Sequence, residues 1–418
     1  MIDFTDCKGL VNSYEGADFK RKIIYDGDVY MLKFGQKLES DERKPMQASY
    51  ASTPVSEYLG SHIYALAGLP TQHTMLGTCN GKTVVACRDF IESRPDAEDV
   101  TLVEFKKLEN SFLGSSTAGG RTPLLDNLLD IFSEHDYLEG IRDAAEERYW
   151  QMFAVDSLIG NFDRHAGNWG YILDRRRNAI IDLAPVYDCG SSLYPALNEA
   201  AMADFIKDRD SLVKRVLDFP RAALRIGKNK VAYHEFLLSD EGAKARAALG
   251  DIMSKIDFCA IHRLIEETPC ISDVRREFYS QLIDVRREAI LEPAYELYRE
   301  ERRREKVIES PVSLKEEARN AKEASEGMKF PRHPRHGHIQ SSQGSSRSSD
   351  DAKVSGMRSW CAAWASPYIR PGASPSHVRV MRSTTASSPS PVIAAISARV
   401  HPVARKATVI ATDSARLT

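Results

Sequence analysis

The chain has 418 residues, which is enough for two or three domains and for a large buried core. Its hydrophobic share of 42% and charged share of 28% are those of an ordinary soluble globular protein. The net charge of −2 gives no general reason to expect binding to nucleic acid or to a membrane surface. No run of about eighteen apolar residues predicts a membrane span.

The cysteines and the first residues indicate a reducing compartment. Seven cysteines are scattered along the chain without C-x-x-C pairs or zinc-ligand spacing, which does not suit a disulfide framework. The opening MIDFTDCKGL has neither the basic region nor the long apolar stretch of a secretory signal. We therefore expect a cytoplasmic protein.

The first part of the chain reads as strands and turns. Two β-rich runs, 22–25 and 29–34, are joined by Asp-Gly-Asp, a strong hairpin signal. Apolar residues then recur at helical spacing over 55–69, and Gly68 and Pro70 are expected to end that helix. A second hairpin is expected over 75–90, with Asn-Gly at its turn. Together these segments predict a small lobe made of a sheet and a helix.

The sequence then becomes helical in character. A largely buried helix is expected over 146–160, followed by a short hairpin formed by 169–173 and 179–183. The motif DVRRE occurs at 273–277 and again at 284–288, which we interpret as a solvated helix face carrying ion pairs rather than as a repeat array.

The domain organisation follows from these changes in composition. We expect a first lobe over 1–95, a second over 96–310, a helical extension over 311–329, and a basic tail over 330–418. The tail is rich in Ser, Pro and Ala and has twelve Lys or Arg against three Asp or Glu, a net charge of +9. Such a composition predicts disorder. A tail without a role in the chemistry is the simpler interpretation, so no specific nucleic-acid partner is expected.

One polar cluster interrupts an apolar region. The stretch DSLIGNFDRHAGNWGYI places Asp163, Arg164, His165 and Asn168 between apolar flanks. Charged residues are seldom found inside a core unless they are paired. The cluster is therefore either a polar turn between two elements or a reacting site.

The order of polar residues matches the needs of phosphoryl transfer. Carboxylate and amide oxygens suit Mg²⁺, and a further carboxylate can accept the proton of an attacking hydroxyl. The chain offers Asp163, Asn168 and, after the predicted hairpin, Asp188. Because a hairpin returns the chain to its starting point, we expect Asp188 to approach Asn168. Gly190 allows a sharp turn behind the acid.

The segments DRHAGN and LAPVYDCG resemble those of HipA-like protein kinases, which have D-x-H-x-x-N, a short hairpin and L-A-P-x-Y-D. DRHAGN is also similar to the D-R-H-x-x-N of phosphoinositide kinases, and departs from the His-Arg-Asp of ordinary eukaryotic-type kinases. The resemblance implies that Asp163 is the general base or orients the hydroxyl. It implies that Asn168 and Asp188 hold Mg²⁺, and that His165 braces the loop.

The resemblance also implies an α+β fold, with the two lobes of a protein kinase. The small β-rich lobe should supply a lysine for the ATP phosphates, and Lys33 in YMLKFG fits, with a side chain leaning out of an edge strand as the alternative. Kinases pair this lysine with a glutamate on the next helix. Glu57 is the best candidate, although Glu57 on the helix surface is an alternative and Glu39 and Glu42 lie nearby in the sequence.

Two further positions are assigned by their place in the chain. Gly16, in NSYEGADFKRK, is a candidate for the loop whose backbone N–H groups cover the phosphates, with an ordinary turn as the alternative. Residues 84–90 lie where a kinase hinge would contact adenine. The resemblance covers about residues 10–310, and the extra amino-terminal domain of toxin-type members is missing or reduced. A toxin–antitoxin role therefore does not follow from it.

The predicted function is an ATP- and Mg²⁺-dependent kinase that phosphorylates Ser or Thr of a protein, with self-phosphorylation compatible with the loop serines. The alternatives are a nucleotide-binding pseudokinase acting as an interaction module, and a phosphoinositide or small-molecule kinase. A metal hydrolase using His165 is poorly supported, because the other histidines show no ligand-like spacing with it.

Overall fold

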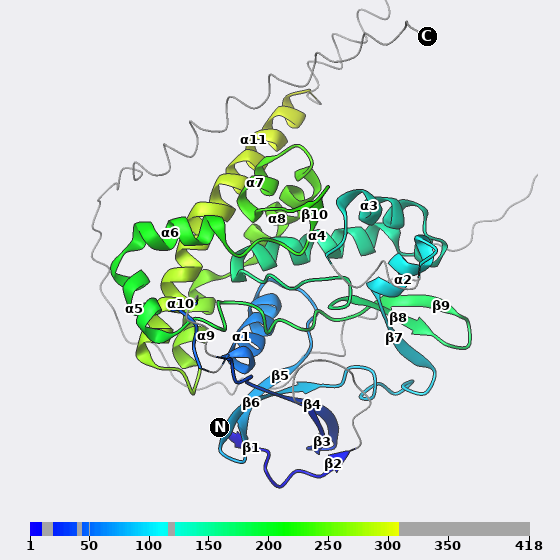
Figure 1. Cartoon of the computed structure of the whole chain (residues 1–418). Helices are drawn as coiled ribbons and strands as arrows, with labels where there is room; N and C mark the ends of the chain where they lie inside the picture. Colours follow the sequence, from blue (N-terminus) through cyan, green and yellow to red (C-terminus); the bar gives the residue numbers. More distant parts are fainter. Residues whose placement is uncertain (11–19, 40–43, 50, 116–121, 309–418) are drawn as a thin grey trace, which may run out of the picture. The chain divides into compact units, whose positions relative to one another are not determined.

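The computed structural model describes residues 1–10, 20–39, 44–49, 51–115 and 122–308. These residues form an α+β structure, rich in strands at its start and in helices after residue 104 (Figure 1). The expected segments 311–329 and 330–418 lie outside the described residues, as do Gly16 and Glu42. The boundary between lobes at 95 stays a prediction.

The strands are β1 Ile2–Asp3, β2 Gly9–Leu10, β3 Lys20–Tyr25, β4 Asp28–Phe34, β5 Thr74–Cys79, β6 Lys82–Arg88, β7 Val100–Glu104, β8 Gly170–Asp174, β9 Ala179–Leu183, β10 Arg225–Ile226 and β11 Asn229–Lys230. The α-helices are α1 Thr53–Leu66, α2 Phe105–Phe112, α3 Leu125–Glu134, α4 Arg142–Ile159, α5 Glu199–Lys207, α6 Arg209–Asp218, α7 Tyr233–Leu238, α8 Ala243–Lys255, α9 Phe258–Glu267, α10 Asp273–Arg286 and α11 Glu292–Ile308. A 3-10 turn at Asp136–Leu138 and a π-helical turn at Arg287–Leu291 complete the described elements.

The first sheet has the strand order β1-β5-β6-β4-β3-β2. Both predicted hairpins are confirmed, as β3–β4 and β5–β6. Their turns contain Asp26 and Gly27, and Asn80 and Gly81, all with positive φ, the conformation that these residue types tolerate best. Strand β4 lies inside the sheet, so Lys33 is not on an edge strand. It pairs across the sheet with Lys20 on one side and Val85 on the other.

Helix α1 packs on this sheet, against β5 and β6 (Figure 1). Its apolar residues Val55, Leu59 and Ile63 are buried, as their helical spacing predicts. The helix ends at Leu66, three residues before the predicted end, and the chain then turns through Gly68 at a φ of +80°. This helix connects the sheet to the part of the chain that carries the polar cluster.

Helix α4 leads directly into the polar cluster. It begins at Arg142, four residues before the predicted start, and nearly all of its last eleven residues are buried. Gly160 ends it in the left-handed conformation, with a φ of +65°. A Cβ at this position would also crowd the guanidinium of Arg286, at a distance of 3.2 Å. The loop that follows therefore leaves the helix in a fixed direction.

The predicted hairpin after the cluster is confirmed as β8–β9, but it belongs to a sheet of three strands. The third strand, β7, pairs antiparallel with β8 and was not predicted. Its sequence, VTLVE, is short, and although the SRPDAED segment before it signals a turn, helix α2 follows it directly, with no second turn to delimit a strand. Tertiary pairing with β8, rather than a local pattern, accounts for this strand.

The prediction of a solvated face with ion pairs is wrong for one arginine of each DVRRE copy, whereas Arg276 and Arg287 form partly exposed ion pairs. Arg275 is 9% exposed and Arg286 is fully buried. Arg275 donates hydrogen bonds to Ser52 and to the Tyr279 hydroxyl, and Arg286 donates from Nε to the carbonyl of Ser157. Charge spacing along a helix does not reveal which face the fold covers. Polar partners meet Arg275, whereas the guanidinium of Arg286 has one hydrogen bond among the described residues and lies over the ring of Tyr233.

No helix among the described residues is both long enough and apolar enough to cross a membrane.

Gly77→Ala should destabilise the first sheet. A Cβ at Gly77 would lie 2.4 Å from the ring of Phe4 and 2.5 Å from the carbonyl of Ile2, on its partner strand. Overpacking of this kind costs about 1–3 kcal/mol, so chemical denaturation should show a lower midpoint. Gly140→Ala is the matched control, because nothing lies within 4 Å of its added Cβ. Equal midpoints for the two variants would contradict the close packing of Gly77.

Candidate active site

Three predicted site residues meet around one ammonium group. Lys33 Nζ lies 3.0 Å from Asp188 Oδ1 and 3.1 Å from Glu57 Oε1. The side chain of Glu57 is 2% exposed and that of Lys33 is 17% exposed, whereas 40% of the Asp188 side chain is exposed. Asp188 therefore faces the open side of this cluster.

The charges in this cluster stabilise one another. Burial alone would lower the pKa of Lys33, but the carboxylates of Asp188 and Glu57 outweigh it and hold that pKa well above its usual range. Burial would likewise raise the pKa of Asp188, and the Lys33 ammonium reverses this effect and lowers it. Both groups are therefore ionised at neutral pH, and the ion pair is intact.

Small residues bring Glu57 to this place. Helix α1 approaches the segment after Asp188 so closely that a Cβ on Gly60 would lie 2.6 Å from the Cβ of Cys189. A Cβ on Gly190 would lie 3.1 Å from Glu57 Oε2. Glu57 has no aligned hydrogen bond to either oxygen, so its contact with Lys33 is an ion pair held by this packing.

Backbone contacts hold Asp163 and Asn168 in one loop. The Asn168 side-chain amide donates to the Asp163 carbonyl at 2.7 Å, and the Asn168 N–H donates to the His165 carbonyl at 2.9 Å. The N–H of Asp163 donates to the side-chain oxygen of Asn161 at 3.1 Å. Within the described residues, the Asp163 carboxylate itself makes no hydrogen bond or ion pair.

The environment of Asp163 suits a proton acceptor. Burial raises the pKa of its carboxyl, and the like charge of Asp188 raises it further, while His165, Lys230 and Arg164 oppose the rise. A carboxylate with a raised pKa and no hydrogen bond to its oxygens is a stronger base than an ordinary aspartate. Asp188 is therefore near enough for its charge to act on the Asp163 carboxyl.

His165 braces the loop, as expected. Its Nδ1 accepts a hydrogen bond from the N–H of Gly167 at 3.0 Å. A Cβ on Gly167 would lie 3.0 Å from the same imidazole ring, so the turn is closed tightly over the histidine. The Tyr187 hydroxyl donates to the carbonyl of Gly167 from the other side.

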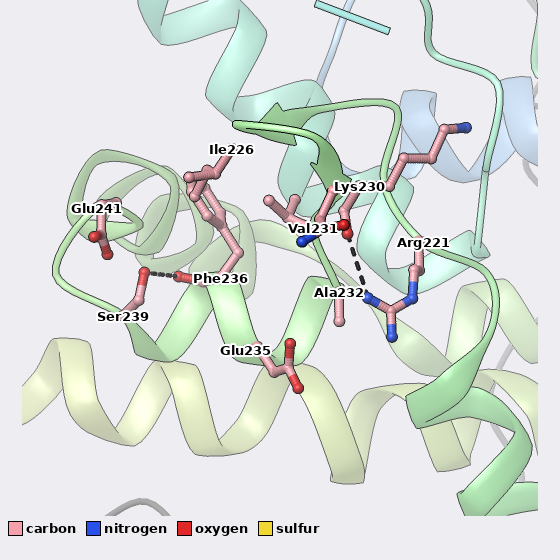
Figure 2. A pocket seen from close by; sticks show the side chains of 10 residues that line it. Arg221, Ile226, Lys230, Val231, Ala232, Glu235, Phe236, Ser239 and Glu241 are labelled. Atoms are coloured by element: carbon pink, nitrogen blue, oxygen red, sulfur yellow. Dashed lines mark hydrogen bonds between the residues drawn. The ribbon is translucent and has the colours of Figure 1, made fainter. Parts of the chain in front are cut away.

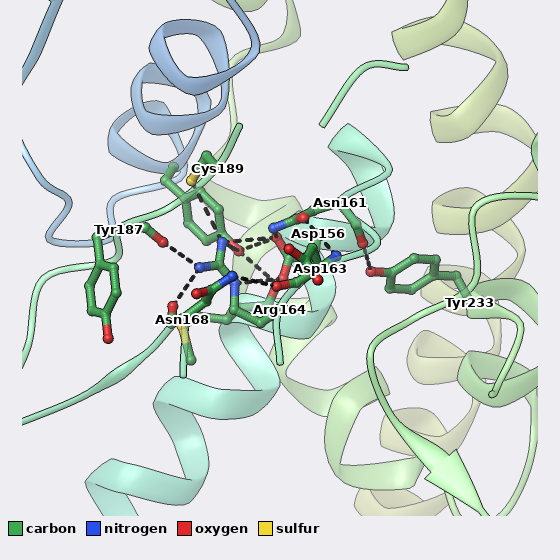
Figure 3. Close-up of polar contacts among 10 residues, drawn as sticks. Asp156, Asn161, Asp163, Arg164, Asn168, Tyr187, Cys189 and Tyr233 are labelled. Carbon is green, nitrogen blue, oxygen red and sulfur yellow. Dashed lines mark hydrogen bonds and ion pairs between the residues drawn. The ribbon is translucent and has the colours of Figure 1, made fainter. Parts of the chain in front are cut away.

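Arg164 connects the loop to the segment that carries Asp188 (Figure 3). Its guanidinium pairs with Asp156 at 3.0 Å and donates to the carbonyl of Asn168 at 2.9 Å. It also donates to the carbonyl of Tyr187, next to Asp188, and to the Cys189 sulfur at 3.6 Å. One side chain thus holds both sides of Asp188 and the end of the Asp163 loop.

Asp156 anchors this network from helix α4. It accepts hydrogen bonds from the Tyr64 hydroxyl at 2.7 Å and from the side chain of Asn161 at 3.0 Å. Sequence reasoning gave neither Asp156 nor Arg164 a role. A signal was present, because an acid within the apolar run MFAVDSLI must be paired if that helix is buried.

The segment after Asp188 is tied to the chain that enters α1. The N–H groups of Ala48 and Ser52 donate to the carbonyls of Ala196 and Pro195, each at 2.8 Å. Asn198 caps helix α5 and donates its backbone N–H to the carbonyl of Met46. These contacts fix the start of α1, and therefore Glu57, relative to Asp188.

The residues present fit a magnesium ion. Because the Asn168 amide nitrogen donates to the Asp163 carbonyl, its side-chain oxygen is left without a hydrogen bond within the described residues. No cluster of three His, Cys, Asp or Glu suited to a metal is found in the described ranges. Mg²⁺ bound with a nucleotide needs only one or two protein ligands, since phosphates and water supply the others.

Comparison with known proteins assigns the family. Residues 13–256 match the family model described as HipA-like C-terminal domain. The serine/threonine-protein kinase CtkA of Helicobacter pylori (strain J99 / ATCC 700824) is 33% identical over 297 residues, which cover 70% of this chain and 87% of the relative. The chain belongs to the HipA-like family, and the α+β kinase-like fold is the one that the sequence predicts.

One solved structure supports this assignment. The crystal structure of a Helicobacter pylori proinflammatory kinase CtkA has a TM-score of 0.65 and 31% sequence identity, covering 72% of this chain and 98% of that one. A HipA of Shewanella oneidensis MR-1, solved with HipB and operator DNA, has a TM-score of 0.40 and 14% identity, covering 70% and 68%.

Removing Arg164 should be strongly destabilising. The side chains of Arg164 and Asp156 are only 5% and 2% exposed, so Arg164→Met leaves a buried carboxylate without its counter-charge. Such losses cost about 3–5 kcal/mol, whereas replacing both partners by apolar residues is often tolerated. We expect Arg164→Met to lower the free energy of unfolding by this amount, and Asp156→Leu/Arg164→Met to recover part of it.

The control is an exposed pair. Lys244 pairs with Glu146 with 62% of the lysine side chain exposed, so Lys244→Met should change stability by less than about 1 kcal/mol. If Asp156→Leu/Arg164→Met were no more stable than Arg164→Met, the loss of stability would not come from the unpaired carboxylate of Asp156.

Proposed function

We propose that the protein is an ATP-dependent kinase that transfers the γ-phosphoryl group to a Ser or Thr hydroxyl of a protein, with Mg²⁺ as cofactor. The observation that carries the proposal is the meeting of Lys33, Glu57 and Asp188 beside the loop of Asp163 and Asn168. Membership of the HipA-like family and the similarity to CtkA support it.

Each residue has a defined role in this proposal. Asp188 and Asn168 would hold Mg²⁺, which neutralises phosphate charge when bound. Lys33, held by Glu57, presents its ammonium to the phosphates. Asp163 accepts the proton of the acceptor hydroxyl while the oxygen of that hydroxyl forms a bond to the γ-phosphorus. The bond between the γ-phosphorus and the oxygen that bridges it to ADP breaks, and ADP leaves.

The chain itself is included among the acceptors. Self-phosphorylation would appear in the simplest assay, in which the purified protein is incubated with labelled ATP and Mg²⁺ and modified residues are mapped by mass spectrometry. Binding of nucleotide without transfer to any protein acceptor would favour the pseudokinase alternative. Transfer to a phosphoinositide or small molecule alone would favour a kinase with another acceptor.

Asp163→Asn and Asp188→Ala should separate transfer from binding. Loss of a general base typically lowers turnover 10²–10⁴-fold, so Asp163→Asn should bind Mg-nucleotide normally and transfer poorly. Asp188→Ala removes a proposed metal ligand and the partner of Lys33, so Mg-nucleotide affinity itself should fall. Calorimetry and a labelled-ATP assay measure the two quantities.

The control for both variants is Asp251→Asn, an exposed acid on α8. It should leave binding and transfer unchanged. Full activity in Asp163→Asn would refute the proposed role of that carboxylate, and normal Mg-nucleotide binding in Asp188→Ala would refute the proposed metal site.

The raised pKa of Asp163 has a measurable consequence. Its carboxyl should titrate above the ordinary value of about 3.9, because burial and Asp188 favour the protonated form. Asp163 must be ionised to accept a proton, so transfer is expected above this pKa and lost as the pH falls through it. Lys230 lowers the pKa, so Lys230→Met should raise it further.

Carbon-detected NMR of the nucleotide-free protein, assigned with Asp163→Asn, measures this pKa directly. An unperturbed or lowered value in the wild type would contradict the environment described for Asp163. A downward shift in Lys230→Met would contradict the influence assigned to the lysine.

A further inference from the structure

A pocket of about 630 Å³ lies between the β10–β11 hairpin and helix α7 (Figure 2). Its apolar lining comes from Ile226, Val231, Ala232 and Phe236. Ile226 is 46% exposed at the tip of the hairpin, although isoleucine is usually buried. The site described above uses none of these side chains.

The pocket is joined to the loop of the proposed base. The Tyr233 hydroxyl, at the start of α7, donates to the carbonyl of Asn161, whose side chain in turn accepts from the N–H of Asp163 (Figure 3). The ring of Phe219, just before the hairpin, lies 5.7 Å from that of Phe162. The charge of Lys230, which lines the pocket, acts on the Asp163 carboxylate. The pocket is therefore connected to the loop that carries the proposed base.

Opposite charges lie on the pocket lining. Arg221 and Lys230 supply positive charge, and Arg221 also donates to the carbonyl of Lys230 at 3.3 Å, which ties it to the hairpin. Glu235 and Glu241, on and after α7, supply negative charge. All four residues are exposed. Within the described residues, none of the four side chains forms a side-chain ion pair.

We propose that this pocket binds the acceptor segment of a protein substrate, and that Arg221 and Lys230 select an acidic side chain close to the phosphorylated Ser or Thr. The proposal rests on the kinase function proposed above. The acceptor hydroxyl must lie at Asp163, and the charge of the pocket residue Lys230 acts on Asp163. An acidic side chain that pairs with Lys230 or Arg221 would therefore lie close to the acceptor. The apolar lining of the pocket would contact the uncharged residues of the same substrate segment.

The acidic residues argue for a peptide rather than a nucleic acid. A phosphate backbone carries negative charge at every residue and would be repelled by Glu235 and Glu241. A peptide can present an acid to the arginine and lysine and a neutral or basic residue to the glutamates. We therefore expect the pocket to bind a polypeptide that has an acidic residue beside its acceptor hydroxyl.

The test compares peptides that differ in one charge. Each peptide has a single serine, with Glu or Lys at one position beside it, and all nearby positions are sampled. We expect wild-type kcat/KM to favour Glu by about tenfold at the best position, and the preference to weaken as salt screens it. Arg221→Glu/Lys230→Glu should reverse the preference. The ratio within each variant is the readout, so a change in overall activity does not affect it.

Two further variants guard against damage to the hairpin. Lys230→Glu alone keeps the hydrogen bond from Arg221 to the Lys230 carbonyl, and Arg221→Gln neutralises the charge while losing that hydrogen bond; each should reduce the preference for Glu. Lys214→Glu is the matched control, since Lys214 is an exposed lysine on α6 outside the pocket. It should leave the ratio unchanged.

A binding arm separates this proposal from the kinase function. The same peptides with Ala in place of Ser are titrated by fluorescence anisotropy, which needs no turnover. Selective binding that the charge variants reverse, without phosphorylation of any acceptor, would overturn the kinase function and leave the pocket assignment standing. Phosphorylation without a preference for Glu, or an equal effect of Lys214→Glu, would overturn the pocket assignment.

Discussion

The buried ion pair between Arg164 and Asp156 is the interaction on which the rest of the site depends. Helix α4 supplies the acid, and the planar guanidinium has enough donors to bind it and two backbone carbonyls together. Those carbonyls belong to Asn168 and Tyr187, on either side of the β8–β9 hairpin. Together with the hydrogen bond from the Tyr187 hydroxyl to the Gly167 carbonyl, this pair fixes the Asp163 loop relative to Asp188.

The charge balance explains why such a site suits a metal and a triphosphate. Glu57, Asp163 and Asp188 bring three carboxylates to the region, and Lys33 contacts two of them. The excess negative charge favours a divalent cation, as does the Asn168 side-chain oxygen, which accepts no hydrogen bond among the described residues. The packing of Gly60 and Gly190 then allows α1 to bring Glu57 close enough to hold the lysine ammonium.

Local patterns in the sequence were sufficient to predict those elements that depend on interactions between residues close together in the chain. Turn residues with positive φ identified both hairpins of the first sheet, and helical spacing identified α1. The order of the motifs led us to expect Asp188 near Asn168, because the hairpin between them returns the chain to the place where it began. Strand β7 and the buried Arg275 and Arg286 were missed, since pairing with a distant strand and burial of one helix face are set by tertiary contacts. The partners of Arg164 were hidden for the same reason.

The most direct test of the account is a crystal structure with Mg²⁺ and a non-hydrolysable ATP analogue. The account predicts one magnesium ion at about 2.0–2.1 Å from the side-chain oxygens of both Asn168 and Asp188, with the phosphates in contact with Lys33 and the Arg164 contacts unchanged. A metal bound away from either residue, or phosphates beyond the reach of Lys33, would contradict it.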